Sequence, residues 1–216
     1  MREWHPEYFL QRCPKHIKAQ MTTVQVQPGE YLLQLGDISR YVYVMLEGEF
    51  KVFHAMENGT DVYPYVGLYN KEFVGDVEAV MGQDAYIGSN VQAKTRCVAV
   101  KMPREAFVEW LYTDMELNRY VMGRYAYWIH LQSEYGSTQA SLSMRARMAR
   151  LIDELLLQHP EREIVSKALL CGVLATSMRS ANRILKQMKE EGMIMVVGDD
   201  VRVLDEDALR SAEYDR

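Results

Sequence analysis

The chain has 216 residues and a formal net charge of −5; 48% of its residues are hydrophobic and 25% are charged. This composition is ordinary for a globular protein, and the length suits two small domains better than one compact domain. No apolar run approaches the roughly 20 residues that cross a bilayer, and the N-terminus has no signal-peptide pattern. We therefore expect a cytoplasmic protein with no membrane partner.

The first 20 residues are expected to form a short helical lead-in, and the sequence from Thr22 to Met102 is typical of β-structure. There, branched and aromatic residues alternate with polar ones, and glycines follow one another at short intervals. Asn58-Gly59 is a strong signal for a two-residue hairpin turn, because both residue types tolerate positive φ. Many short antiparallel strands joined by regular turns predict a barrel or a sandwich.

Pro103 opens a helical region in which one set of side chains recurs at heptad spacing. The set consists of Leu117, Val121, Arg124, Trp128, Leu131 and Tyr135. This narrow stripe favours pairing of the helix with a second copy of the chain, and the alternative is a helix that packs only on its own β domain. The Gly-Ser-Thr sequence at 136–138 is expected to interrupt the helix and to act as a hinge. Ser143 can cap the next helix, which is expected to end near Gln158.

Residues 166–191 have the pattern of a helix-turn-helix. Ser166 can cap a short apolar helix from Lys167 to Leu174. A tight turn of small residues follows, and Ser177 can cap a second helix that ends near Glu191. The segment 193–204, with a glycine and two aspartates at its centre, predicts a hairpin of the kind that forms the wing of a winged helix.

One face of the second helix carries a polar stripe at spacings i, i+3, i+4 and i+7, made by Arg179, Asn182, Arg183 and Lys186. Arginine can present its donor fork to guanine, asparagine can pair with adenine, and lysine suits a phosphate. Residues 141–189 carry nine basic against four acidic side chains, although the rest of the chain is acidic. Binding to double-stranded DNA requires such a local basic face, so this helix is the candidate DNA reader.

The sequence resembles the Crp/Fnr family of transcription regulators, which are similar to the cyclic-AMP receptor protein. The resemblance rests on glycine-containing motifs of the β region and on an ungapped match over the helix-turn-helix. These segments are Pro28-Gly29-Glu30 through Leu35-Gly36-Asp37, Tyr43 to Gly48, Phe73-Val74-Gly75-Asp76, Val91 to Thr95, and Val165 to Ile194. The implied fold is α+β. It has a cyclic-nucleotide-binding-like β-roll (an antiparallel double-stranded jelly roll) in residues 1–112, a dimerisation helix in 113–137 and a winged helix-turn-helix in 138–216.

The resemblance implies a bacterial, homodimeric, sequence-specific DNA-binding regulator of transcription that is not an enzyme. It makes RNA polymerase a further candidate partner and places base reading at three positions of the second helix. Two of these depart from the cyclic-AMP receptor protein, because Met178 replaces an arginine and Arg179 replaces a glutamate, so we expect a different half-site. The expected DNA-facing residues are Met178, Arg179, Asn182, Arg183, Lys186, Ser166, Thr176 and Ser177.

The phosphate-binding cassette that the resemblance implies is degenerate. Gly75-Asp76 stands where the family has Gly-Glu, and the family's Arg-Ser aligns with Ile87-Gly88, or with Tyr86-Ile87 if the insertion falls after it. No lysine or arginine occurs in residues 72–93. A buried cyclic phosphate needs a paired cation, so we expect no binding of cyclic AMP or cyclic GMP. The alternatives are an unidentified effector in or near the β-roll and a filled pocket with no effector. The expected pocket residues are Tyr63, Tyr65, Gly75, Asp76, Tyr86, Ile87, Gly88, Ser89, Gln132 and Ser133.

Two other classes of protein compete with a DNA reader. A cupin-type enzyme needs clustered metal ligands, but the five histidines are scattered and the three cysteines form no C-x-x-C pair. Cys13 stands alone at the N-terminus, which does not favour an iron–sulfur cluster, and we expect no metal and no other cofactor. In the second class, the winged helix contacts another protein, and only DNA-binding measurements distinguish it from a DNA reader.

Overall fold

The computed structural model describes residues 6–55, 61–63, 72–82, 85–158 and 164–213. These residues form two compact units, one made by residues 1–54 and 67–127 and the other by residues 55–66 and 128–216. Over the described residues, no helix combines the length and the apolarity that crossing a bilayer requires. The hairpin turn expected at Asn58-Gly59 lies outside the described residues.

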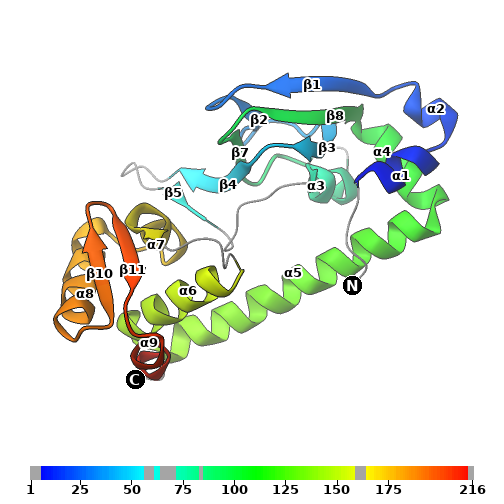
Figure 1. The fold of residues 1–216 in the computed structure, drawn as a ribbon. Coiled ribbons are helices and arrows are strands. Elements are labelled where there is room, and N and C mark those ends of the chain that lie inside the picture. Colours follow the sequence, from blue (N-terminus) through cyan, green and yellow to red (C-terminus); the bar gives the residue numbers. More distant parts are fainter. Residues whose placement is uncertain (1–5, 56–60, 64–71, 83–84, 159–163, 214–216) are drawn as a thin grey trace. The chain divides into compact units, whose positions relative to one another are not determined.

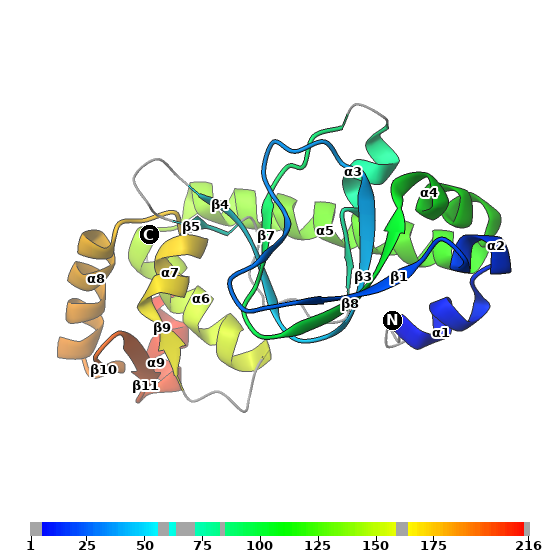
Figure 2. The same cartoon turned by 90° about the horizontal axis from the view of Figure 1, so that it is seen from above.

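The first unit is built on a β-roll of two antiparallel sheets (Figure 1). One sheet has the order β1-β8-β3-β6, and Figure 2 shows β1, β8 and β3 side by side; in the other sheet β2, β7 and β4 are neighbours in this order. The strands are β1 (Thr22–Val26), β2 (Tyr31–Leu33), β3 (Tyr41–Glu47), β4 (Phe50–Ala55), β6 (Phe73–Val74), β7 (Asn90–Ala93) and β8 (Cys97–Pro103). The jelly-roll-like β domain expected from the sequence is confirmed.

The alternation of side chains along β3 connects the two cores of this unit. Val42 and Val44 are fully buried against the helices, whereas Met45 points to the other face and is buried between the sheets. The helices of the unit are α1 (Pro6–Arg12), α2 (Lys15–Lys18), α3 (Asp76–Met81), α4 (Arg104–Thr113) and the first part of α5 (Met115–Ser141). Phe107 and Trp110 of α4 are fully buried in the same core as Val42 and Val44. This core fixes the helices on the β-roll.

The long helix α5 continues without a break to Ser141. The prediction that the helix is interrupted at 136–138 is therefore wrong. One glycine within a long helix costs only about 1 kcal/mol, and the helical turns on both sides of it maintain the helix. The chain turns instead just after Ser141, and the Ser143 hydroxyl accepts a hydrogen bond from the Ala146 N–H at 3.2 Å. Ser143 thus begins the next helix, as expected.

The second unit contains the predicted winged helix-turn-helix. Its elements are the end of α5, β5 (Asp61–Val62), α6 (Met144–Gln158), β9 (Val165–Ser166), α7 (Lys167–Val173), α8 (Met178–Glu190), β10 (Ile194–Val197), β11 (Asp200–Val203) and α9 (Glu206–Ala212). The small sheet has the order β10-β11-β9 and is antiparallel. The helix-turn-helix and its wing, both expected from the sequence, are confirmed.

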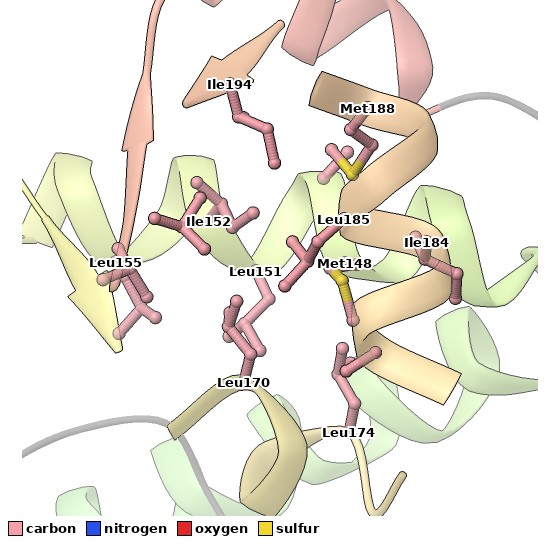
Figure 3. Close-up of a cluster of buried hydrophobic side chains, with 14 of the residues drawn as sticks. Met148, Leu151, Ile152, Leu155, Leu170, Leu174, Ile184, Leu185, Met188 and Ile194 are labelled. Atoms are coloured by element: carbon pink, nitrogen blue, oxygen red, sulfur yellow. The ribbon is translucent and has the colours of Figure 1, made fainter. Parts of the chain in front are cut away.

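The core of the second unit lies among α6, α7, α8 and β10. Figure 3 shows that Leu151 and Ile152 of α6, Leu170 of α7, Leu185 of α8 and Ile194 of β10 extend into one cluster, and each is at most 2% exposed. Burial of each such side chain contributes roughly 1.5–3 kcal/mol. The buried face of α8 therefore decides which of its side chains remain on the surface.

Candidate nucleic-acid interface and sensor pocket

Two serines begin the two helices of the helix-turn-helix. The Ser166 hydroxyl accepts a hydrogen bond from the Leu169 N–H at 3.2 Å, and the Ser177 hydroxyl accepts one from the Ser180 N–H at 3.2 Å. These bonds satisfy helix N–H groups that have no partner within the helix. Between the helices Ala175 adopts φ of 48°, which lets the chain reverse within a short turn. The serines expected at DNA thus have a structural role as helix caps.

The recognition helix α8 presents two different faces. Ala181, Ile184, Leu185 and Met188 are buried in the core of the unit, and Figure 3 shows Leu185 and Met188 pointing into it. The opposite face is exposed and contains every residue of the polar stripe, Arg179, Asn182, Arg183 and Lys186, together with Met178. The structure thus brings these five expected residues to one surface.

The charged groups of this surface have free donors. Among the described residues, neither Arg179 nor Arg183 has an ion-pair or hydrogen-bond partner, and Lys186 lies 3.7 Å from the Glu190 carboxylate on an exposed surface. Exposed pairs of this kind contribute less than about 1 kcal/mol, so a phosphate can compete for the lysine. Thr176 is half-buried in the turn, and its N–H donates to the Cys171 carbonyl at 3.0 Å.

The wing is acidic at its tip and is tied to α7. Lys167 is 8% exposed, and its ammonium donates to the Gly198 carbonyl at 2.6 Å, while its N–H donates to the Asp199 carbonyl at 2.9 Å. Lys167 therefore holds the wing and is not available to a phosphate. Because Asp199 and Asp200 would repel phosphates, the basic surface of α8 is the better candidate for contact with DNA.

In the sensor unit, a buried cation pairs with two carboxylates of the degenerate cassette. Arg124 of α5 lies 3.2 Å from an Asp76 carboxylate oxygen and 2.9 Å from a Glu72 carboxylate oxygen, measured from its guanidinium nitrogens. The Tyr125 hydroxyl donates to the same Asp76 oxygen at 3.2 Å. Side-chain exposures of 12% for Arg124 and 5% for Asp76 place this group out of water. We refer to Arg124, Asp76 and Glu72 as the arginine–carboxylate triad.

Burial and charge compete within the triad. Burial raises the pKa of Asp76 and of Glu72, because it disfavours the charged carboxylates, and the guanidinium of Arg124 acts in the opposite direction. Burial likewise raises the pKa of Tyr125, and its hydroxyl remains a donor. Gly75 precedes Asp76 with φ of 82°, and a Cβ there would lie 2.8 Å from the Tyr41 carbonyl oxygen, so only glycine fits.

The rest of the cassette is also occupied by groups of the chain itself. The Gly88 N–H donates to a Glu78 carboxylate oxygen at 3.0 Å, and the Ser89 hydroxyl lies 3.0 Å from His54 Nε2. An acidic side chain thus takes a backbone donor that an external anion would need. The sequence argument missed both pairs, because their members lie 10 and 35 residues apart.

The other expected pocket residues belong to the second unit, to the surface of the first unit or to its interior. Tyr63 belongs to the second unit, where its N–H donates to the Gly172 carbonyl at 3.1 Å. Gln132 and Ser133 are exposed on α5, Ile87 is buried, and Tyr86 is 64% exposed. Tyr65 lies outside the described residues. No group of three or more histidine, cysteine or acidic side chains in the described part of the chain could hold a metal ion.

The heptad stripe of α5 does not form one exposed surface. Leu117 and Val121 are fully buried in the core of their own unit, and Arg124 points to the acidic residues of the cassette. Trp128 is half-buried, and the side chains of Leu131 and Tyr135 lie outside what the structure describes. Other apolar residues of the helix, at Met115, Met122 and Ile129, are exposed instead.

Comparison with known proteins identifies both units. The family model described as the cyclic nucleotide-binding domain matches residues 23–114, and the one described as the Crp-like helix-turn-helix domain matches residues 146–212. The chain belongs to the Crp/Fnr family of transcription regulators. This Crp/Fnr regulator is therefore a DNA-binding protein and not an enzyme. None of the curated proteins compared with the chain matches it.

Solved structures share the fold of this Crp/Fnr regulator at low sequence identity. A c-di-GMP-responsive global regulator of Xanthomonas campestris is 18% identical with a TM-score of 0.75, and the match covers 91% of this chain and 98% of that one. A Crp/Fnr-family regulator of Eubacterium rectale is 12% identical with a TM-score of 0.74, covering 94% and 96% of the two chains. A third, from Thermus thermophilus, is 18% identical with a TM-score of 0.69, covering 90% and 100%. At these identities the similarity concerns the fold alone.

Proposed function

We propose that this regulator binds double-stranded DNA as a homodimer, reads bases with the exposed face of α8, and responds to an effector other than a cyclic nucleotide. The observation that carries the proposal is the division of α8 into a buried apolar face and an exposed basic face whose arginines have no partner among the described residues. Arg179 and Arg183 therefore keep all of their donors for base edges or phosphates. RNA polymerase is a further partner that the family resemblance suggests.

The dependence of duplex binding on salt tests this proposal directly. The logarithm of the association constant is expected to fall linearly with the logarithm of the salt concentration. The slope of this line is about −0.9 for each neutralised phosphate, so a dimer with several phosphate contacts should give a slope of about −4 or steeper. Lys186→Ala should make the slope shallower by about 1 for each protomer, whereas Gln187→Ala, an exposed change on the same helix, should leave it unchanged. A winged helix that contacts only protein would show no binding of duplex DNA.

The exposed face of α5 supports the homodimer. Met115, Met122 and Ile129 are separated by seven residues each and are 73%, 42% and 69% exposed. Side chains at this spacing lie along one side of a helix, and apolar side chains exposed in a row mark an interface. The proposed dimer face is thus a different side of α5 from the stripe expected from the sequence, because Leu117 and Val121 of that stripe are used by the chain's own core.

Ile129→Glu is expected to weaken the dimer, because two buried carboxylates would face each other across a symmetric interface. We expect the dimer dissociation constant from analytical ultracentrifugation to rise at least about tenfold, since burial of unpaired charge costs more than 1.4 kcal/mol. Leu157→Glu on α6, at a leucine that is 63% exposed, is the matched control and should leave the constant unchanged. Equal behaviour of the two variants would place the interface elsewhere.

The arginine–carboxylate triad supports an effector other than a cyclic nucleotide. One guanidinium faces two carboxylates there, so the fully ionised triad has a net charge of −1 before any ligand arrives. A cyclic phosphate would add another negative charge in a buried environment, and residues 72–93 contain no lysine or arginine to pair with it. Repulsion and desolvation therefore both oppose its binding.

A further inference from the structure

A groove of about 610 Å³ opens on the sensor unit beside β2 and β3. Two of its lining residues, Leu33 and Tyr41, also lie next to Gly75, the residue before Asp76 of the triad. Gly36, Asp37 and Ile38 line it from one segment, and Tyr86 and Ile87 line it from another. Three backbone hydrogen bonds fasten these segments: Gly36 N–H to the Ile87 carbonyl at 2.9 Å, Ile87 N–H to the Asp37 carbonyl at 2.8 Å, and Ser39 N–H to the Ala85 carbonyl at 3.1 Å. The walls are thus held by the backbone, and the groove exists before any ligand binds.

Large apolar side chains line this groove and remain open to water. Ile38 is 51% exposed, Tyr41 is 39% exposed and Tyr86 is 64% exposed. Leu33 also lines it, and Tyr43 contributes a third aromatic ring. Pockets of roughly 300–1,000 Å³ with apolar walls and a few polar groups are the usual size and composition of sites for small molecules. The walls can therefore hold the hydrophobic part of a ligand.

The same groove is lined by one acid and one base that do not neutralise each other. Asp37 and Arg40 both line it, no ion pair joins them, and neither side chain has a partner among the described residues. Their separation in sequence is three residues, and both are exposed. The Lys101 ammonium lies 3.7 Å from the centre of the Tyr41 ring and adds positive charge at this edge. A ligand that carries both charges would satisfy both groups.

We propose that the groove binds a free α-amino acid with a large apolar side chain. An α-amino acid carries a carboxylate and an ammonium on one carbon atom, so Arg40 can bind the carboxylate through its donor fork while Asp37 accepts from the ammonium. The apolar side chain then lies against Ile38, Tyr41 and Tyr86. This proposal depends on the fold of the sensor unit and not on DNA binding. It gives the effector of the proposed function a chemical class and a binding site.

Titration of the ¹⁵N-labelled full-length protein, followed by NMR in the absence of DNA, tests the groove. L-phenylalanine and L-leucine are expected to shift the amide signals of residues 36–41 and 85–87 with dissociation constants below about 1 mM. Glycine should bind at least about tenfold more weakly, because it lacks the apolar side chain. Phenethylamine and 3-phenylpropionate each lack one charge and should bind about tenfold more weakly than phenylalanine.

A variant of Arg40 tests whether this residue binds the carboxylate of the ligand. Arg40→Ala should weaken binding of L-phenylalanine about tenfold and leave the binding of phenethylamine unchanged, since that ligand has no carboxylate. Lys94→Ala, at an exposed lysine on the turn after β7, is the matched control and should change neither. The proposal is overturned if neither amino acid shifts these signals at about 10 mM, or if Arg40→Ala binds phenylalanine as the wild type does. DNA binding by α8 can succeed or fail independently of this result.

Discussion

Replacing Arg124 by alanine is expected to lower the free energy of unfolding by about 3–5 kcal/mol at neutral pH, measured by urea denaturation. The substitution leaves Asp76 and Glu72 without their cation, and both carboxylates are shielded from water, with side-chain exposures of 5% and 24%. A buried charge without a partner costs far more than the pair itself contributes. Truncation at an exposed arginine would cost less than about 1 kcal/mol.

The loss should depend on pH in a defined direction. Burial raises the pKa of Asp76 and Glu72 above the unfolded values, so each contributes stability at low pH that is lost as pH rises through its folded-state pKa. Without Arg124 the pKa of each carboxyl rises further. The difference between the wild type and Arg124→Ala should therefore be smaller at about pH 5 than at about pH 8.

Neutral partners provide the control for this result. The triple variant Arg124→Met, Asp76→Asn, Glu72→Gln removes all three charges and should be more stable than Arg124→Ala alone. If Arg124→Ala and the triple variant lose equal amounts of stability, then lost packing and not unpaired charge is the cause. A loss of stability in Arg124→Ala that does not change with pH would also show that unpaired charge is not the cause.

Replacing Arg183 by alanine is expected to weaken binding to the preferred DNA sequence by about 1–3 kcal/mol for each protomer's contact, and to relax selectivity at one base pair. Arg183 lies in the exposed stripe of α8 and has no partner among the described residues, so its whole donor fork is available to a guanine. The preferred sequence is obtained first, by selection from a random duplex library with the wild-type protein. Gel shifts on that sequence and on random DNA then measure the two affinities.

A base reader and a phosphate binder give different patterns in this experiment. Arg183→Ala should lose affinity mainly for the selected sequence, whereas Lys186→Ala should lose it on both DNAs, since phosphates are present in every sequence. Gln187→Ala on the same helix is the control and should change neither affinity. An equal loss on selected and random DNA for Arg183→Ala would contradict base reading by this residue.

Local sequence patterns predicted the DNA-binding unit well. Ser166 and Ser177 were expected to begin helices, and both hydroxyls accept the N–H three residues later. The helical repeat of 3.6 residues per turn predicted that Arg179 and Arg183 lie on the opposite face of the helix from Leu185. In the structure both arginines are exposed and Leu185 is buried. Such features depend on residues a few positions apart, and their geometry follows from the helix itself.

Contacts between distant residues could not be predicted in this way. The heptad spacing correctly placed Leu117, Val121 and Arg124 on one stripe, but spacing alone does not say whether the chain's own core or a second chain covers that stripe. Arg124 joins Asp76 across 48 residues of sequence. A charged residue within an apolar stripe was the one signal of this pairing, because a buried arginine needs an acidic partner.

Calorimetric titration of the full-length protein with cyclic AMP and with cyclic GMP tests most directly the claim that the chain's own groups occupy the cassette. The triad and the Glu78–Gly88 pair predict no binding heat with either nucleotide at concentrations up to about 1 mM. Binding of either nucleotide with a dissociation constant below about 1 μM would contradict the account, because such affinity corresponds to about 8 kcal/mol and requires a cation that residues 72–93 lack.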